Sequence, residues 1–259
     1  MQKVIIIGGG ASGIMTAIHA TSKNNEVVVL ERNSSCCKKL LMTGNGRCNY
    51  WNEDQQINHY NSNKQEELEK IITPKNQKDV LSFFDQIGII PKIKEGYYYP
   101  FSNQAVSVEY ALLLQAKLNG IKIITDCFVS DIEYKNNFII KTNKGKMLAD
   151  KVVIATGSKA IPKTGSDGNG YFLAEILGLL VTPVLPSLDQ LKGEEKYFKN
   201  WNGIRTEVDI SIYENDNFIK KELGEIQLTN YGISGICVFN LSRYASKYLS
   251  LKHKVSVKI

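Results

Sequence analysis

The sequence predicts an α/β fold built on a parallel sheet, and its first thirty residues carry the observations behind this prediction. An apolar run, Val4–Ile7, passes directly into the glycine-rich segment Gly8–Gly13. A second apolar run, Val27–Leu30, ends in the acidic residue Glu31. This order of strand, glycine turn, helix, strand and acid is that of a Rossmann-like βαβ unit, whose first turn holds a dinucleotide.

Each residue type in this unit has a physical role. Gly8 permits a sharp turn, Gly10 lets the backbone approach a pyrophosphate, and Gly13 lets the helix pack close to the strand. The phosphates then lie at the helix N-terminus, where several N–H groups lack intrahelical partners. The Glu31 carboxylate can accept hydrogen bonds from ribose hydroxyls. The alternative is a glycine-rich turn that binds no ligand.

Later elements follow from periodicity and turn residues. Residues 50–65 are polar and are predicted to form a mobile excursion, and a helix is predicted over 79–87. A second helix is expected to run from an N-cap at Ser102 to Asn119. Five strands are expected next, a β-meander that leads into a returning strand ending in Ala155, Thr156 and Gly157: 121–124, 128–134, 138–142, 146–148 and 151–157.

Two prolines divide the rest of the chain. A tight loop at 165–170 precedes a predicted helix over 171–180, and Pro183 and Pro186 then mark a boundary. The predicted domains are therefore a Rossmann-like domain over 1–185 and part of a β-rich domain over 186–259. In the second domain we expect strands at 208–213, 225–228 and 254–259, with a helix through Leu241 and Tyr248.

Composition narrows the classes of protein that fit. The chain has 259 residues and a formal charge of +6, but only four of its 32 basic residues are arginine. Arginine is the preferred residue for bidentate phosphate and base contacts, so the charge indicates a solvated surface and no nucleic-acid partner. No apolar run has the length of a membrane span or of a signal-peptide core, so we expect a cytoplasmic protein without a membrane partner.

The five cysteines favour neither a disulfide framework nor a zinc site. Their number is odd and no CxxC pair occurs. The adjacent Cys36 and Cys37 are either a redox pair or two loop cysteines without a role. The three histidines lack ligand spacing or a paired acid, so no metal site is predicted.

Several segments along the whole chain match one family: Ile6–Gly13 with Glu31, Lys39–Asn49, Tyr99–Ser102, Ala155–Gly157, Pro162–Ser166 and Thr229–Gly235. Together they resemble the BaiN-like flavoproteins, also described as aminoacetone oxidase-like or YhiN-like FAD-binding enzymes. The Thr43–Asn49 block is far more specific than the glycine turn. Ser158 departs from the family pattern, where a second glycine is usual, and so does Asn169, where an aspartate is usual.

The resemblance implies a bound FAD and redox chemistry on a small organic substrate. It also implies a β-rich domain inserted into the FAD domain, followed by a return of the chain to the flavin that this sequence does not contain. The cofactor site implied by the turn and the resemblance comprises Gly8, Gly9, Gly10, Ala11, Ser12, Gly13, Glu31, Arg32, Lys39, Thr43, Gly44, Asn45, Gly46, Arg47, Cys48, Asn49, Val129, Ala155, Thr156 and Gly157.

Some of these residues have two interpretations. Arg47 suits phosphate charge or the charge of reduced flavin, or is a surface arginine after a turn. Cys48 is a redox partner of the flavin or a small buried residue. Val129 contacts adenine through its backbone or is an ordinary strand valine. The aromatic run Tyr97–Tyr99 lines a substrate pocket or packs in a core.

The function predicted from these features is an FAD-dependent oxidoreductase that transfers hydride through flavin N5, with NAD(P)H as a candidate electron donor and dioxygen or an unsaturated or carbonyl compound as acceptor. No catalytic residue is nominated, and the oligomeric state is left open. The alternatives are a truncated dinucleotide-binding chain without catalytic competence and an NAD-binding regulatory module.

Overall fold

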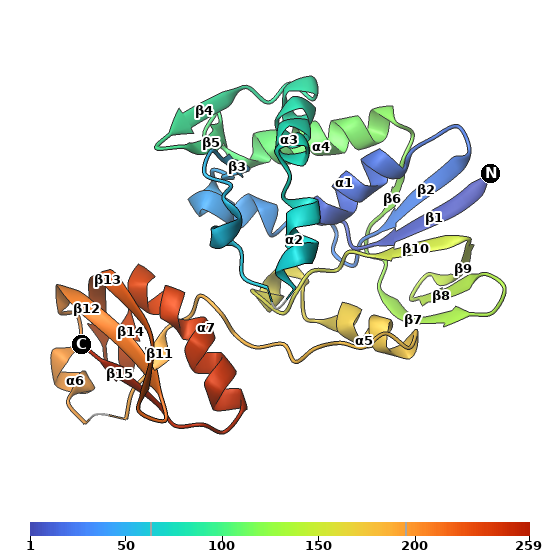
Figure 1. Cartoon of the computed structure of the whole chain (residues 1–259). Helices are drawn as coiled ribbons and strands as arrows, with labels where there is room; N and C mark the ends of the chain where they lie inside the picture. The colour runs from blue at the N-terminus through green and yellow to red at the C-terminus, as the bar shows by residue number, and fades with distance from the viewer. Residues whose placement is uncertain (63, 195) are drawn as a thin grey trace. The chain divides into compact units, whose positions relative to one another are not determined.

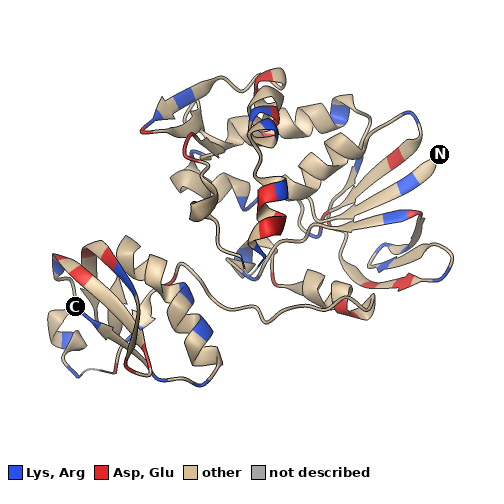
Figure 2. Cartoon of the chain, in the orientation of Figure 1, with Lys and Arg blue, Asp and Glu red and all other residues tan. Residues whose placement is uncertain are grey.

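The computed structural model describes residues 1–62, 64–194 and 196–259. The chain divides into two compact units, Met1–Val181 and Thr182–Ile259 (Figure 1). Lys and Arg are interspersed with Asp and Glu on both units (Figure 2). The predicted α/β class is confirmed: a parallel Rossmann-like sheet forms the core of the first unit, and antiparallel sheets accompany it.

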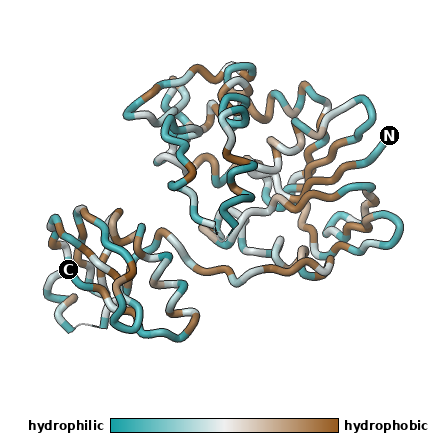
Figure 3. The backbone as a smooth tube through the Cα atoms, viewed as in Figure 1, coloured by the Kyte–Doolittle hydropathy of each residue, from teal (hydrophilic) through white to brown (hydrophobic). Residues whose placement is uncertain are grey.

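The central sheet of the first unit has four parallel strands in the order β10–β1–β2–β6. Their bounds are β1 Gln2–Ile7, β2 Asn25–Leu30, β6 Lys122–Ile124 and β10 Lys151–Ile154. Strands covered on both faces carry continuous apolar runs rather than alternating ones. The side chains of Ile5 and Ile6, which point to opposite faces of β1, are both fully buried, and hydrophobic residues run along β1 and β2 in Figure 3.

The two faces of this sheet are covered differently. Helices α1 (Ala11–Ala20) and α4 (Ala105–Leu118) pack on the face that includes Val4 and Ile6. The opposite face is covered by an antiparallel meander together with helix α5. The bounds of these elements are β7 Val129–Tyr134, β8 Phe138–Thr142, β9 Gly145–Ala149 and α5 Asn169–Ile176.

The segment between β2 and α4 holds shorter elements of the first unit. Residues 50–65, predicted as a mobile polar excursion, contain the short strand β3 and the turn η2, and their mobility stays a prediction. A three-stranded antiparallel sheet has the order β3–β5–β4. The bounds here are η1 Leu40–Gly46, β3 Trp51–Asn52, η2 Ile57–His59, α2 Gln65–Ile71, α3 Pro74–Gln86, β4 Pro91–Lys94 and β5 Tyr97–Pro100, with η3 Pro162–Thr164 later in the chain.

The second unit is a five-stranded antiparallel-paired sheet in the order β11–β14–β13–β12–β15, with helix α7 packed on it. Ile210, Ile212 and Ile226 form its core with Val238 and Leu241 of the helix. The bounds are β11 Leu191–Lys192, α6 Phe198–Trp201, β12 Arg205–Glu214, β13 Asn217–Thr229, β14 Gly232–Ser234, α7 Ile236–Ser250 and β15 Val255–Lys258.

The start of helix α4 and the end of helix α5 differ from the predictions. Helix α4 begins at Ala105 with Gln104 as its N-cap, because Asn103 adopts a left-handed φ of 55° and separates Ser102 from the helix. Helix α5 ends at Ile176 rather than at residue 180, because Gly178 adopts a φ of 81° just after its last turn.

Candidate functional site

The carboxyl ends of β1, β2 and β10 meet at one edge of the parallel sheet, where a cavity of about 500 Å³ opens. Ligands bind at this edge in open α/β sheets. The cavity is lined by the last residues of β1 and β2, Ile7 and Leu30. It is also lined by the residues that come directly after β1, β2 and β10, which are Gly8, Glu31 and Ala155. The predicted turn and acid therefore lie beside one space.

The glycines of the first turn differ in what a side chain would meet. A Cβ on Gly8 would lie 2.5 Å from the Ala155 carbonyl oxygen, and φ at Gly8 is 108°. A Cβ on Gly13 would lie 1.9 Å from the Gly8 carbonyl oxygen. A Cβ on Gly10 would meet nothing within 4 Å, although Gly10 lines the cavity. The packing of the protein itself thus explains Gly8 and Gly13, whereas the space at Gly10 fits the close approach of a ligand.

Glu31 is held firmly at the end of β2. Its side chain is buried, with 6% of the residue exposed. The Gly9 amide donates to Oε2 at 2.7 Å, and the backbone and side-chain nitrogens of Asn33 donate to Oε1 at 2.8 and 2.7 Å. These bonds fix the carboxylate and occupy three of its about four lone-pair sites, which leaves about one site on Oε2 to accept from a ligand.

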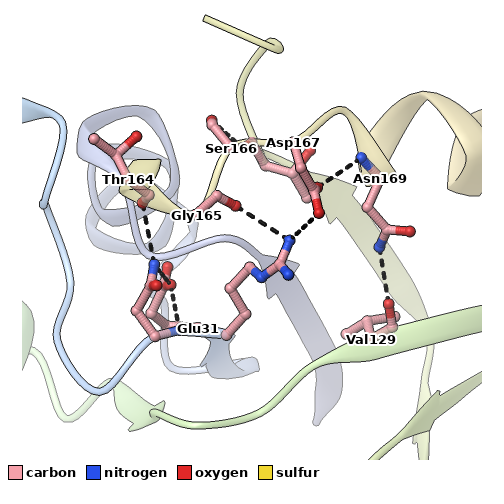
Figure 4. A network of polar contacts seen from close by, with 10 residues as sticks. Glu31, Val129, Thr164, Gly165, Ser166, Asp167 and Asn169 are labelled. Atoms are coloured by element: carbon pink, nitrogen blue, oxygen red, sulfur yellow. Dashed lines mark hydrogen bonds and ion pairs between the residues drawn. The ribbon is translucent and has the colours of Figure 1, made fainter. Parts of the chain in front are cut away.

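A loop formed by residues 164–169 is tied to the strand ends by polar contacts (Figure 4). Asn33 Nδ2 donates to the Thr164 carbonyl oxygen at 3.2 Å, and Asn169 Nδ2 donates to the Val129 carbonyl oxygen at 2.9 Å. Ser166 Oγ donates to the Thr156 carbonyl oxygen at 2.9 Å. The loop therefore forms one wall of the cavity.

Arg32 joins the same loop. Its Nη1 donates to Asp167 Oδ2 at 2.6 Å and to the Gly165 carbonyl oxygen at 3.4 Å, and its guanidinium lies 5.0 Å from the centre of the Phe128 ring. The hydrogen bond from Arg32, assisted by the Asn169 amide, holds the pKa of the Asp167 carboxyl below its usual range. Asp167 is therefore ionised at neutral pH.

The Thr43–Asn49 block folds as the end of η1 and a tight turn. Gly44 and Asn45 adopt left-handed φ values of 55° and 56°, and the Cys48 amide donates to the Thr43 carbonyl oxygen at 3.0 Å. Arg47 Nε donates to the Gly44 carbonyl oxygen at 2.9 Å, and its guanidinium lies 5.2 Å from the centre of the Tyr99 ring. The turn places Thr43, Cys48 and Asn49 on the cavity wall.

The cavity brings together most of the residues predicted from the sequence. Its lining includes Gly8, Gly10, Ala11, Ser12, Glu31, Arg32, Lys39, Thr43, Cys48, Asn49, Val129, Ala155, Thr156 and Gly157. It does not include Gly9, Gly13, Gly44, Asn45, Gly46 and Arg47. Gly9 and Gly13 instead support the turn, since a Cβ on Gly9 would lie 2.6 Å from Cys36 Sγ.

Other lining residues were not identified from the sequence. A polar group comes from the loops that follow the strands: Asn33, Ser35, Lys38, Thr164, Gly165, Ser166, Asp167 and Asn169. A mainly apolar group comes from the helices and their connections: Met15, Leu40, Tyr50, Phe84, Val108 and Leu112. Two signals pointed to part of the first group: the Pro162–Ser166 match and the departure from the family pattern at Asn169.

The cysteines near the cavity are buried thiols. All five cysteines are free. Burial raises the pKa of Cys36 to about 11, helped by the charge of Glu31, and burial raises the pKa of Cys37 to about 12. Burial also raises the pKa of Cys48. These thiols are protonated at neutral pH, which favours the interpretation of small buried residues over redox partners.

Within residues 1–62, 64–194 and 196–259, none of the helices combines the length and apolar character needed to cross a bilayer. No group of three or more His, Cys, Asp or Glu side chains in these ranges is arranged to hold a metal ion.

A family comparison decides where this fold belongs. The HI0933-like protein Rossmann domain matches residues 2–245. The chain belongs to the HI0933-like family. It is 36% identical over 262 residues to the 3-dehydro-bile acid delta(4,6)-reductase of Clostridium scindens. This match covers 100% of this chain and 64% of that protein. The predicted resemblance to the BaiN-like flavoproteins is confirmed by these two matches.

Other proteins similar to this chain bear a different name. The chain is 28% identical over 247 residues to the ribosomal RNA dihydrouridine synthase of Haemophilus influenzae, a match over 93% of this chain and 61% of that protein. The chain thus spans less than two thirds of the length of these curated relatives.

Solved structures of low sequence identity also align with the chain. Thermovibrio ammonificans THI4 aligns with a TM-score of 0.43 at 16% identity, over 78% of this chain and 70% of that one. A 3-ketosteroid-delta4-(5alpha)-dehydrogenase from Rhodococcus jostii RHA1 aligns with a TM-score of 0.45 at 14% identity, over 61% of this chain and 46% of that one.

Proposed function

We propose that this chain forms the FAD-binding part of a flavin-dependent oxidoreductase that acts on a small organic substrate. One observation carries the proposal: the cavity meets the open position at Gly10 and the fixed carboxylate of Glu31 at the carboxyl edge of the parallel sheet. Membership of the HI0933-like family, in which one named relative is a reductase, supports it.

The polar end of the cavity suits the adenosine and pyrophosphate parts of FAD. Ala11 and Ser12 lie in the first turn of α1, where backbone amides lack intrahelical acceptors and attract phosphate. Glu31 would accept from the ribose hydroxyls. Lys39 lines the cavity close to Gly157 and adds positive charge there.

The apolar group of lining residues suits a planar ring system. Such surfaces exclude water and hold aromatic ligands through contact area. When bound, the flavin supplies N5 as the atom that accepts or donates hydride. The residues of this chain would place that ring and keep water from it, and the raised pKa of the buried Cys48 thiol supports a wall residue rather than a redox partner.

The finer parts of the proposal concern partners. We take NAD(P)H or a reduced substrate as the electron donor, and dioxygen or an unsaturated or carbonyl compound as the acceptor. The relative named as a delta(4,6)-reductase supports an unsaturated substrate. The expectation of no nucleic-acid partner stays a prediction, because other relatives are named for ribosomal RNA. The cytoplasmic location also stays a prediction.

The visible spectrum of the purified chain, before and after addition of FAD, tests the proposal. We expect flavin bands near about 370 and 450 nm that remain with the protein after gel filtration. Gly10→Val should abolish this retention while leaving the unfolding transition unchanged, because its side chain would extend into the cavity. Gly10→Ala is the matched variant with one methyl group and should weaken binding less. Full retention of flavin in Gly10→Val would refute the assignment.

A second candidate is a dinucleotide-binding chain without catalytic competence. The observation in its favour is that the chain spans less than two thirds of its curated relatives. If the chain binds FAD but neither NAD(P)H nor any of a panel of reduced small organic substrates bleaches the 450 nm band, about where oxidised flavin absorbs, this candidate is preferred. Binding of NAD without FAD would instead indicate the regulatory module.

A further inference from the structure

The adenosine end of the cavity contains two carboxylates and one arginine whose guanidinium is already paired. Glu31 and Arg32 are adjacent in sequence at the end of β2, and Asp167 pairs with Arg32 from the loop over residues 164–169. All three residues line the cavity, and Figure 4 shows Glu31 and Asp167 from close by.

In dinucleotide-binding folds, an acidic residue after the second strand accepts a hydrogen bond from the ribose 2′-hydroxyl, whereas a nearby arginine accommodates a 2′-phosphate. Taken alone, the pair Glu31–Arg32 offers both options. In the folded chain, however, Arg32 directs Nη1 to Asp167 and Gly165 and lies over the Phe128 ring. Its charge is therefore compensated before any ligand enters.

We infer that Asp167 makes the adenosine end of this site reject nucleotides that carry a 2′-phosphate. A phosphate placed at the ribose 2′ position would face the carboxylates of Glu31 and Asp167 and would have to displace the Arg32 ion pair. The inference rests on the proposed dinucleotide site and deepens it by naming the ligand class: adenosine nucleotides with a free 2′-hydroxyl, such as FAD.

The experiment compares ADP-ribose with 2′-phospho-ADP-ribose by titration calorimetry at low ionic strength. These probes contain the pyrophosphate but no redox group, so the readout does not depend on turnover. We expect the chain to bind ADP-ribose at least about tenfold more tightly, since each carboxylate near 4 Å from a phosphate charge weakens binding by about fivefold in water. Added salt should reduce this preference.

Asp167→Asn tests the residue. The amide keeps an oxygen that can accept from the Asn169 amide, a bond now made at 3.1 Å by Asp167 Oδ1. Because Asp167 and Arg32 are both partly exposed, their ion pair contributes little stability and the variant should fold. We expect the preference for ADP-ribose to fall by about fivefold or more in this variant.

Glu26→Gln is the matched control. It removes the same charge from an exposed ion pair with Lys3, but at the opposite end of β2. It should leave the preference unchanged. Equal binding of the two probes by the parent chain, or an unchanged preference in Asp167→Asn, would overturn the inference while leaving the dinucleotide site intact. Failure of the chain to bind either probe would overturn the proposed site itself, and the inference with it.

Discussion

At the scale of single residues, Gly10 and Gly13 separate the needs of the fold from the needs of a ligand. Gly13→Ala should lower the free energy of unfolding by about 3 kcal/mol, because its methyl group would stand 1.9 Å from the Gly8 carbonyl oxygen in a rigid turn. Gly10→Ala adds the same methyl group in open space and should change stability by less than about 0.5 kcal/mol. Urea unfolding measures both, and equal losses would contradict this reading of the turn.

The buried thiols give a second prediction at this scale, a loss of stability at alkaline pH. Cys36 and Cys37 have pKa values raised to about 11 and about 12 in the folded chain. Their stabilising effect is complete below the ordinary thiol pKa of about 8.5 and is lost as the pH rises through the folded values, because the unfolded chain releases these protons first. The free energy of unfolding, measured by urea titration, should therefore fall between pH 8 and pH 10 by about 2 kcal/mol for each thiol.

The double variant Cys36→Ala, Cys37→Ala serves as the control for this pH dependence. Its absolute stability will differ from that of the parent chain because two buried side chains become smaller. What decides the matter is the slope of stability against pH, which should be shallower than in the parent chain. An identical slope would mean that other groups cause the alkaline loss.

At the scale of elements, local patterns predicted the strands of the meander better than the helix ends. The meander could be predicted because each strand is a short β-rich run between turn residues, and β8 has the predicted bounds 138–142. Helix α3 starts before the predicted residue 79, since Thr73 accepts from the Asn76 amide and Pro74 begins the helix. The meander is marked by a pattern that repeats along several strands, whereas the start of α3 depends on one capping residue.

The loop over residues 164–169 shows where prediction from one sequence stops. Arg32 and Asp167 are 135 positions apart, so no local pattern joins them. The glycine turn and Glu31 could be placed because a βαβ unit is a local structure with a known ligand position. The opposite wall of the cavity depends on how β10 returns beside β1, and the side chains that it brings to Arg32 and Asn33 are fixed only by the tertiary fold.

At the scale of the whole molecule, the two compact units are expected to unfold independently. Each has its own apolar core, represented by the fully buried Ile6 in Met1–Val181 and Ile212 in Thr182–Ile259. Calorimetry should show two transitions. Ile6→Ala should lower the free energy of unfolding of the first unit by about 3 kcal/mol, and Ile212→Ala that of the second unit by a similar amount. FAD at about 100 times its Kd should raise the free energy of unfolding of the first unit alone, by about 2.7 kcal/mol, because the cavity lies within that unit. A single transition shifted by both variants would show one cooperative unit and refute the predicted division near residue 185.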